Sequence, residues 1–497
     1  GDVNKNKEII KDLVKNAYDD GVSILSLPEL SLTGASLYDG YKDMALLCED
    51  AILELKEFSK GYNILFSVGF PLQHNRKIYN AIALIMDGYL VDLFTKKNLS
   101  IIEKNVFSND MPDGEVIQFL DDWCEVNPSS TSISQLNIGV SIGEDEMMGI
   151  PRSLTYKSDI ANCPQIILNP TAEVKMALNE EEILNRVRFL SKDVTYVYTS
   201  QGRGESSTDF VYNGLNIIAE DGRIEKVICN NQIDYVNRYR LYTDQELLHF
   251  DKFEENIGQK EKFPYLPIYE KRDTYVKDVL DIGASALLTR MQKIGVKNVF
   301  LGVSGGLDST MVLLFLVHAY KKAGLDLSGI NCYTMPAFGT SDRTKSNAYL
   351  LCKALGLKLR EINITDAVKI HLRDIGHDGV SADTAYENAQ ARERTQILFD
   401  LANMHKGIVI GTGDLSEAMQ GFATFNGDQM SNYSLNASLT KTEIRYIVGA
   451  IAETTENPKL RRVLEDILDT PISPELISQD KKEISQKTED IIGPYEL

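Results

Sequence analysis

Hydrophobic and polar positions alternate with two different periods along the first half of the chain. Apolar residues at helical spacing predict helices over 5–19, 43–60 and 179–192. Apolar runs bounded by Gly, Asn and Asp predict strands over 22–30, 62–70, 80–88, 89–96, 135–145, 163–171, 194–201 and 214–224. Strand–helix units mixed with several hairpins predict a layered α/β sandwich.

This pattern breaks down between residues 247 and 272, where the chain is charged, contains proline and lacks periodicity. We interpret this segment as a linker between a domain at 1–246 and a domain at 273–497. Beyond the linker, helices are predicted over 273–294, from Ser309 onward, over 342–355 and over 385–404, alternating with strands over 298–303, 329–336, 359–364 and 407–412. Regular alternation of this kind predicts a doubly wound parallel sheet.

Composition narrows the class of protein. The 497 residues include 72 acidic and 52 basic side chains, a net charge of −20, which argues against a nucleic-acid partner. No apolar run approaches the roughly 20 residues that span a bilayer, and the N-terminus lacks the apolar core of a signal peptide. The six cysteines are scattered without a CxxC pair. We therefore expect a cytoplasmic protein with reduced thiols and no membrane partner.

The strongest local signal is the stretch NVFLGVSGGLDST at 298–310, a strand that runs into a glycine turn and then a helix. Gly305 and Gly306 let the backbone approach a ligand, and the following helix N-terminus favours an anion. Asp308 would repel a bare phosphate, which suggests a bridging Mg²⁺. The alternative is a plain turn in which Asp308 or Ser309 caps the helix.

The loop sequence SGGLDS resembles the pyrophosphatase loop of ATP pyrophosphatases. Four further segments follow in order: MPAFGTSDRT at 335–344, YENAQARERTQILFDLAN at 386–403, GIVIGTGDLSEAM and its continuation at 407–446, and ILDTPISPEL at 467–476. Together they resemble the glutamine-dependent NAD synthetases. The resemblance implies a Rossmann-like, adenine nucleotide alpha-hydrolase-like domain in a homo-oligomer. It also implies ATP-dependent amidation of deamido-NAD (nicotinic acid adenine dinucleotide) through an acyl-adenylate, with release of AMP and pyrophosphate.

The same resemblance implies roles for individual residues. The ATP-binding residues would be Gly302, Val303, Ser304, Gly305, Gly306, Leu307, Asp308, Ser309 and Thr412. Asp308 and Glu417 would hold Mg²⁺. The deamido-NAD site would be lined by Asn388, Glu417, Phe422, Ala423, Thr424, Phe425, Asp428 and Lys441.

The first half resembles the nitrilase-like carbon–nitrogen hydrolases, which implies an αββα sandwich that releases ammonia from glutamine with a Glu–Lys–Cys triad. SLPELSLTG places the glutamate at Glu29, and LFTKKNLS places the lysine at Lys96, with Lys97 as the less favoured alternative. The cysteine position in GVSIGEDE, however, is Gly143. Glycine cannot form the required thioester. We therefore predict an inactive glutaminase, with Glu29 and Lys96 as relics or a buried ion pair, and a ligase that takes ammonia instead of hydrolysing glutamine.

Two other interpretations remain open: a different enzyme with the same loop, such as a GMP or asparagine synthetase or a tRNA-modifying enzyme, and a pseudoenzyme or assembly subunit. The acidic charge counts against the former, and the intact loop with Glu417 and Lys441 counts against the latter. Members of the family carry a strand ahead of GDVNKN and continue past QKTEDIIGPYEL, so we expect a fragment or a natural short form.

Overall fold

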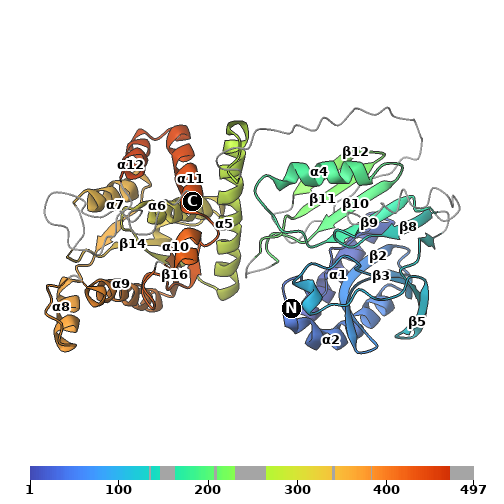
Figure 1. The fold of residues 1–497 in the computed structure, drawn as a ribbon. Helices are drawn as coiled ribbons and strands as arrows, with labels where there is room; N and C mark the ends of the chain where they lie inside the picture. The colour runs from blue at the N-terminus through green and yellow to red at the C-terminus, as the bar shows by residue number, and fades with distance from the viewer. Residues whose placement is uncertain are drawn as a thin grey trace. The chain divides into compact units, whose positions relative to one another are not determined.

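The computed structural model describes residues 1–133, 136–145, 163–205, 210–229, 265–338, 342–381, 383–421 and 423–470. The chain forms two compact units, Gly1–Ile257 and Gly258–Leu497, each of which is described by itself (Figure 1). The division falls inside the predicted linker 247–272, most of which lies outside the described residues, so the domain bounds stay a prediction. Phe422 and residues 471–476 of the last motif also lie outside the described residues.

The first unit contains two six-stranded sheets. In spatial order, one sheet consists of β1 (Ile24–Leu25), β2 (Leu65–His74), β3 (Lys77–Met86), β4 (Tyr89–Thr95), β6 (Asp122–Val126) and β5 (Glu115–Phe119). The other consists of β12 (Arg223–Cys229), β11 (Leu215–Glu220), β10 (Thr195–Ser200), β9 (Ile166–Thr171), β8 (Leu136–Val140) and β7 (Thr131–Ile133). The helices are α1 (Val3–Asp19), α2 (Tyr41–Phe58) and α4 (Asn179–Leu190), with short 3₁₀ turns η1 (Tyr38–Gly40) and η2 (Glu103–Asn105).

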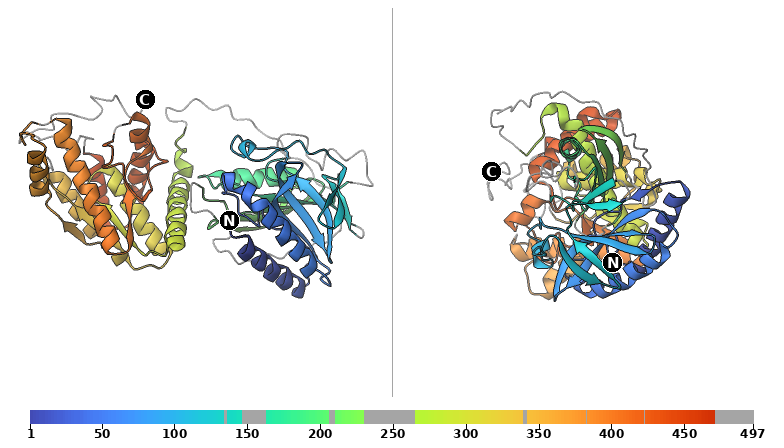
Figure 2. Two further views of the ribbon diagram at one scale, coloured as in Figure 1. Left: turned by 90° about the horizontal axis from the view of Figure 1, so that it is seen from below. Right: turned by 90° about the vertical axis from the view of Figure 1, so that its right-hand side faces the viewer.

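Three apolar clusters define four layers in this unit. Helices α1 and α2 lie side by side and pack on the outer face of the first sheet (Figure 2). The inner faces meet through residues such as Leu84 of β3 and Leu168 of β9, and α4 covers the outer face of the second sheet. The predicted αββα sandwich is therefore confirmed.

Two local differences from the sequence prediction have physical reasons. The strand predicted over 22–30 keeps only Ile24–Leu25 in the sheet, because the Leu27 amide donates to Ser67 Oγ (2.9 Å) and not to the backbone of β2, and the chain then turns at Leu30 (φ +50°). The hairpin of β5 and β6 was not predicted, since its strands are short and alternate buried with exposed positions.

The second unit is built on one five-stranded sheet. In spatial order its strands are β15 (Leu359–Glu361), β14 (Ile330–Thr334), β13 (Asn298–Gly302), β16 (Gly407–Gly411) and β17 (Tyr433–Ser434), all parallel to their neighbours. The helices are α5 (Arg272–Ile294), α6 (Leu307–Lys322), α7 (Asp342–Ala354), α8 (Thr365–Asp374), α9 (Thr384–Met404), α10 (Leu415–Gln420), α11 (Lys441–Thr454) and α12 (Pro458–Leu468), with 3₁₀ turns η4 (Tyr269–Lys271) and η5 (Leu327–Gly329).

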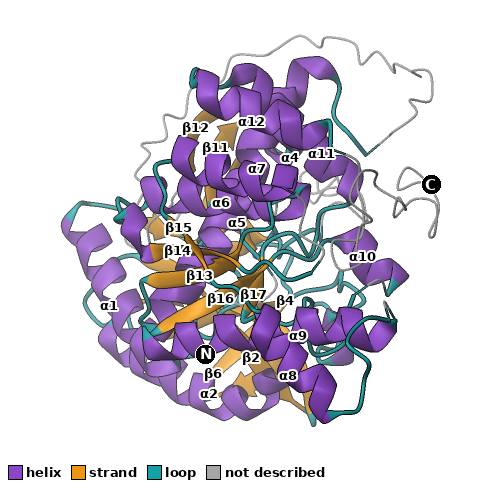
Figure 3. Ribbon diagram, turned by 90° about the vertical axis from the view of Figure 1, so that its left-hand side faces the viewer, coloured by secondary structure: helices purple, strands orange, loops and turns teal. Residues whose placement is uncertain are grey.

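Helices cover both faces of this sheet. Helices α8 and α9 pack on one face around Phe300 and Val409, while α6 and α7 lie on the other (Figure 3). The predicted doubly wound parallel sheet is confirmed, although α8, α10, α11, α12 and β17 were not predicted. The strand order reverses at β13, and ligands of such sheets bind beyond the carboxyl ends of the strands at this point. Among the described helices, none is long and apolar enough to cross a membrane.

Candidate functional site

The glycine turn lies at the carboxyl end of β13. The Val303 amide donates to the Tyr333 carbonyl (2.7 Å), which fixes the start of the turn against β14. Gly305 has a φ of +92°, a conformation that side chains with a Cβ disfavour. Gly306 is the N-cap of α6, and no described side chain caps this helix. The first amides of α6 are therefore available to an anion, and Asp308 and Ser309 do not occupy the capping position.

Two serine hydroxyls hold the turn in shape. Ser304 Oγ accepts from the Gly306 amide (3.1 Å) and lies 3.2 Å from Ser309 Oγ. Ser309 Oγ can in turn donate to the Gly306 carbonyl (3.2 Å). These contacts pre-form the loop around its own backbone, so that a phosphate group would meet amides already in place.

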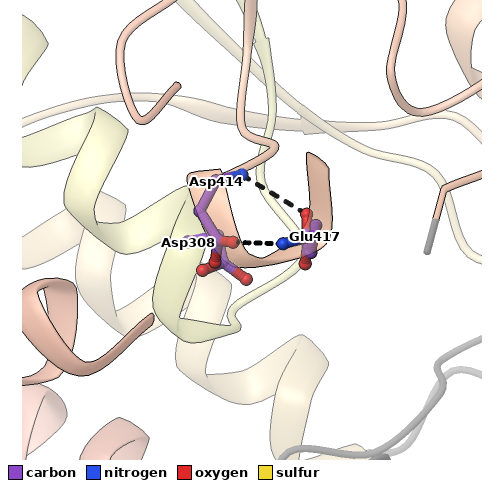
Figure 4. A group of neighbouring side chains, drawn as sticks. All are labelled: Asp308, Asp414 and Glu417. Carbon is purple, nitrogen blue, oxygen red and sulfur yellow. Dashed lines mark hydrogen bonds between the residues drawn. The ribbon is translucent and has the colours of Figure 1, made fainter. Parts of the chain in front are cut away.

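Three carboxylates gather beside the turn (Figure 4). Asp308 lies in the first turn of α6, while Asp414 and Glu417 belong to the start of α10. One oxygen from each lies within 4.8 Å of the others. The Glu417 amide donates to Asp414 Oδ1 (2.8 Å), and the Asp414 amide donates to Glu417 Oε2 (3.4 Å), a capping box that fixes both side chains.

Lys441 enters this cluster from the first position of α11. Its Nζ lies 2.6 Å from Asp414 Oδ2, 2.8 Å from Asp308 Oδ1 and 3.1 Å from Glu417 Oε1, and the residue is only 2% exposed. Burial disfavours the ammonium, but the three carboxylates outweigh this and raise the pKa of Lys441. Burial also raises the pKa of Asp308, against the opposing pull of Lys441.

The charges of the cluster do not balance. With all three carboxyl groups ionised, the one ammonium leaves about two negative charges in a partly buried place, which attracts a further cation. Hard carboxylate oxygens are the donors that Mg²⁺ prefers. Asp308 and Glu417 remain half-buried, whereas Asp414 is fully buried against Lys441. The donor set therefore fits a magnesium ion held by Asp308 and Glu417.

Sequence reasoning missed Asp414 and Asn436. Asn436 Nδ2 donates to the Asp308 carbonyl (3.1 Å) and to the Thr412 carbonyl (3.0 Å), so it ties the end of β16 to the start of α6. Thr412 thereby lies next to the glycine turn. The Asp-x-x-Glu spacing after a buried strand is a capping-box signal that could have found Asp414. No local signal marks Asn436, because its contacts are long-range.

The other predicted dinucleotide residues form a second group. Thr424 Oγ1 donates to Asn388 Oδ1 (2.7 Å), and the Thr424 amide donates to Asp428 Oδ1 (2.7 Å). Ala423 is exposed, and Phe425 is 78% exposed. These hydrogen bonds connect α9 with the segment after α10. Glu417 and Lys441, which were predicted for the same dinucleotide site, lie in the carboxylate cluster instead.

The first unit buries a different lysine–carboxylate group. Glu29, which is 2% exposed, accepts from Lys96 Nζ (2.8 Å) and Asn80 Nδ2 (2.6 Å) at Oε1. Its Oε2 accepts from the Ala172 amide (3.0 Å). The structure therefore brings the two predicted residues Glu29 and Lys96 into direct contact.

Lys96 also contacts a carboxylate that was not predicted. Its Nζ donates to Glu103 Oε1 (2.8 Å), and Glu103 Oε2 accepts from the Ser100 amide (2.8 Å). Burial disfavours the Lys96 ammonium, but Glu29 and Glu103 outweigh this and raise its pKa. The second carboxylate was missed because it lies in a short 3₁₀ turn with no apolar pattern.

Gly143 lies against this pair. Its φ is +59°, its amide donates to the Pro170 carbonyl (2.8 Å), and its carbonyl accepts from Asn169 Nδ2 (2.9 Å). A Cβ at this position would lie 2.9 Å from Lys96 Nζ and 3.3 Å from Glu29 Oε2. A side chain here would point at the ion pair, and glycine supplies none.

Comparison with known proteins matches both units. The family model for NAD synthase matches residues 282–494, and the model for carbon-nitrogen hydrolase matches residues 1–196. The glutamine-dependent NAD(+) synthetase of Mycobacterium leprae (strain TN) is 32% identical over 548 residues, which cover 100% of this chain and 80% of the relative. That of Mycobacterium tuberculosis (strain ATCC 25618 / H37Rv) is 31% identical over 551 residues, with the same coverage.

Two solved structures share the fold. The glutamine-dependent NAD+ synthetase from Acinetobacter baumannii, in complex with ADP, gives a TM-score of 0.70 at 21% identity, covering 93% of this chain and 82% of that one. The glutamine-dependent NAD(+) synthetase from Cytophaga hutchinsonii gives a TM-score of 0.72 at 20% identity, covering 94% of this chain and 81% of that one. The two-unit architecture is therefore common to this chain and both structures.

Proposed function

Because the chain belongs to the family of glutamine-dependent NAD(+) synthetases, ligases that form carbon–nitrogen bonds, we propose that its second unit amidates deamido-NAD to NAD⁺ with ATP. One observation carries the proposal: Lys441 and three carboxylates converge on an uncapped glycine turn at the reversal point of the sheet. This arrangement combines anion donors, a buried cation and oxygen ligands within one small volume.

The chemistry requires activation of a carboxylate. Ammonia cannot displace oxide from the nicotinate carboxylate, so a carboxylate oxygen first attacks the α-phosphorus of ATP and the bond to pyrophosphate breaks. Ammonia then attacks the acyl carbon of the adenylate, loses a proton, and AMP leaves. The pyrophosphate and the adenylate both carry charge that must be offset in the transition states.

The residues of the second unit divide this work. The turn from Gly302 to Ser309 would hold the ATP phosphates with its amides and hydroxyls, and Thr412 would contact the nucleotide. Lys441 would offset charge on the departing pyrophosphate. Asp308 and Glu417 would hold Mg²⁺, which when bound offsets phosphate charge and fixes its orientation.

The deamido-NAD site would extend from the cluster to the residues beyond α10. Asn388 and Asp428, each of which accepts a hydrogen bond from Thr424, would with Thr424 present amide, carboxylate and hydroxyl groups to the dinucleotide. The exposed ring of Phe425 offers a stacking face, and Phe422, which lies outside the described residues, stays a predicted member of the same site. Glu417 and Lys441 would line the same site at the end next to the carboxylate cluster.

We propose free ammonia, or ammonia made by another protein, as the nitrogen source. The glutaminase reaction needs a thiolate between Glu29 and Lys96, and position 143 has no side chain. Loss of a catalytic nucleophile costs on the order of 10⁶ in kcat in the best-studied protease case. Substrates of the proposed reaction are thus ATP, deamido-NAD and ammonia, with glutamine unused.

The test is NAD⁺ formation by the full chain from deamido-NAD and ATP–Mg²⁺, run in parallel with ammonium chloride and with glutamine. We expect activity with ammonium and none above background with glutamine. Asp308→Asn is the control for contaminating synthetase, because it removes a proposed metal ligand at nearly constant size. Equal activity with glutamine overturns the assignment of the nitrogen source, and silence with both donors overturns the ligase.

A further inference from the structure

A hollow lies along the neighbouring strands β13, β14 and β15 of the second sheet. It has a volume of about 300 Å³ and is lined by Asn298, Asn331, Tyr333, Arg360 and His405. Asn298 begins β13, Asn331 and Tyr333 belong to β14, Arg360 is the middle residue of β15, and His405 lies in the turn before β16. Tyr333 is next to the glycine turn, since it pairs with Gly302 in the sheet and its carbonyl accepts from the Val303 amide. No residue of the glycine turn or of the carboxylate cluster lines the hollow.

A row of stacked rings holds the lining in place. The His405 ring stacks on Phe300 with centroids 6.1 Å apart, and Phe300 stacks on Tyr333 at 6.3 Å. The Arg360 guanidinium lies 5.6 Å from the centroid of the Tyr333 ring. Because Phe300 and Tyr333 are buried, the two polar ends of this row, Arg360 and His405, are fixed at the surface.

Hydrogen bonds orient the same side chains. Arg360 Nη1 donates to Asn331 Oδ1 (3.1 Å), and Asn331 Nδ2 donates to the Gly329 carbonyl (3.1 Å). Asn298 Nδ2 donates to the His405 carbonyl (3.0 Å). A guanidinium has five N–H donors in a rigid fork, so several remain for a ligand after the bond to Asn331.

The rim of the hollow is basic in a chain whose net charge is −20. Lys297, Lys358 and Lys406 are exposed and precede β13, β15 and β16. The neighbouring carboxylates are engaged elsewhere: Glu361 pairs with Lys345 (2.9 Å), and Asp326 accepts from the Ser328 amide (2.8 Å). The carboxyl end of α9 adds roughly half a negative charge. The positive charge of Arg360 and the three lysines is larger than this.

We propose that this hollow binds a small oxyanion, a carboxylate or phosphate group, with Arg360 as the bidentate donor and His405 as a second polar group of the same lining. The volume is at the lower end for ligand sites, which suits a compact anion and not a dinucleotide. The site is independent of the proposed ligase reaction, because none of its residues belongs to the glycine turn or the carboxylate cluster.

The test is isothermal titration of the full chain at low ionic strength with inorganic phosphate and, separately, with succinate. Three variants accompany the wild type: Arg360→Gln with His405→Gln removes both donors, Ser304→Ala with Ser309→Ala weakens the glycine turn, and Arg373→Gln removes an exposed arginine of α8 that pairs with Asp374. We expect at least a tenfold loss of affinity in the first variant and less than a twofold change in Arg373→Gln, while the turn variant reports any phosphate that is bound at the glycine turn instead.

Binding of phosphate alone assigns the site to phosphate groups, and binding of succinate alone assigns it to carboxylates. The proposal is overturned if neither anion binds, if only the turn variant loses binding, or if Arg373→Gln loses as much as the hollow variant. Should the double variant fail to fold, Lys358→Glu at the exposed rim must weaken binding severalfold, and an unchanged affinity there also overturns the site.

Discussion

Each unit buries one lysine among carboxylates, yet the two groups differ in what surrounds them. Lys441 and its three carboxylates adjoin the uncapped amides of a glycine turn, so the group has a place for a charged ligand. Lys96 lies between Glu29 and Glu103, and the position facing them is a glycine. A buried ion pair is thus no evidence of catalysis by itself. It can persist for stability, because removing one partner leaves a charge buried without compensation.

The largest effect should come from the second unit. Replacing Asp308 by Ala removes a proposed metal ligand and one of the three carboxylates around Lys441. We expect a loss of about 10³-fold in ammonium-dependent NAD⁺ formation, since single groups that stabilise developing charge contribute on this order. Asp326→Ala, which removes an exposed carboxylate of the same unit, should change the rate less than twofold. Similar losses in both variants would contradict a specific role for Asp308.

In the first unit, removing a carboxylate from the buried lysine should lower folding stability and leave the ligase rate unchanged. Glu29→Ala leaves Lys96 buried with Glu103 as its remaining carboxylate. We expect a loss of about 3 kcal/mol in the free energy of unfolding, measured with urea. The rate with ammonium should stay within twofold. A selective loss of glutamine-dependent activity would show that Glu29 still takes part in hydrolysis.

Asp145, near the Glu29–Lys96 ion pair, should make the free energy of unfolding of the first unit depend on pH. It accepts from the Lys97 amide (3.0 Å) and the Asn98 amide (2.6 Å), and burial raises its pKa to about 6. A folded-state pKa above the unfolded value means that the folded chain binds more protons, so the contribution of Asp145 to stability falls as the pH rises from about 4 to about 6.

Asp145→Asn should remove this fall, and the variant should gain about 1–2 kcal/mol relative to wild type between pH 4 and pH 7. Urea unfolding at both pH values measures it. Asp121→Asn serves as the control, because Asp121 is an exposed turn residue with no resolved contact. An unchanged difference between wild type and Asp145→Asn across this range would show that the carboxyl is not buried as described.

The smallest expected effect isolates the crowding at position 143. Gly143 and Gly21 both have positive φ values, +59° and +75°, but a Cβ at Gly21 would meet nothing within 4 Å. Gly21→Ala should therefore cost only the backbone strain, about 1 kcal/mol. Gly143→Ala should cost that and about 0.5–1 kcal/mol more, since the Cβ approaches Lys96 Nζ. Equal costs would mean that Lys96 moves aside freely.

Local pattern sufficed for the fold and for part of the site. Buried strands such as β2, β3 and β13 have apolar runs that indicate strands directly. Glycine and asparagine residues next to these runs mark where the turns lie. Asp308, Glu417 and Lys441 were identified because they belong to short segments with a recognisable order. Short half-exposed strands such as β5 carry too few apolar residues to be distinguished from loops.

The remaining site residues depend on tertiary structure. Asp308 and Lys441 are 133 residues apart, and only the meeting of two helix N-termini brings Lys441 Nζ to Asp308 Oδ1. Asn436 and Glu103 act through long-range or loop contacts that have no period in the sequence. Polar partners of this type cannot be inferred from spacing, because a polar residue on a surface gives the same local pattern.

The backbone conformation at Gly143 also bears on how the chain can change through mutation. Glycine adopts a φ of +59° at lower cost than residues with a Cβ, so folding stability disfavours most substitutions at this position even though glycine has no side chain for a reaction. Some glycine codons differ from a cysteine codon by a single base, and Glu29 and Lys96 already lie in contact. A single base change at such a codon would supply the third member of the triad, against the cost in folding stability that this backbone conformation imposes.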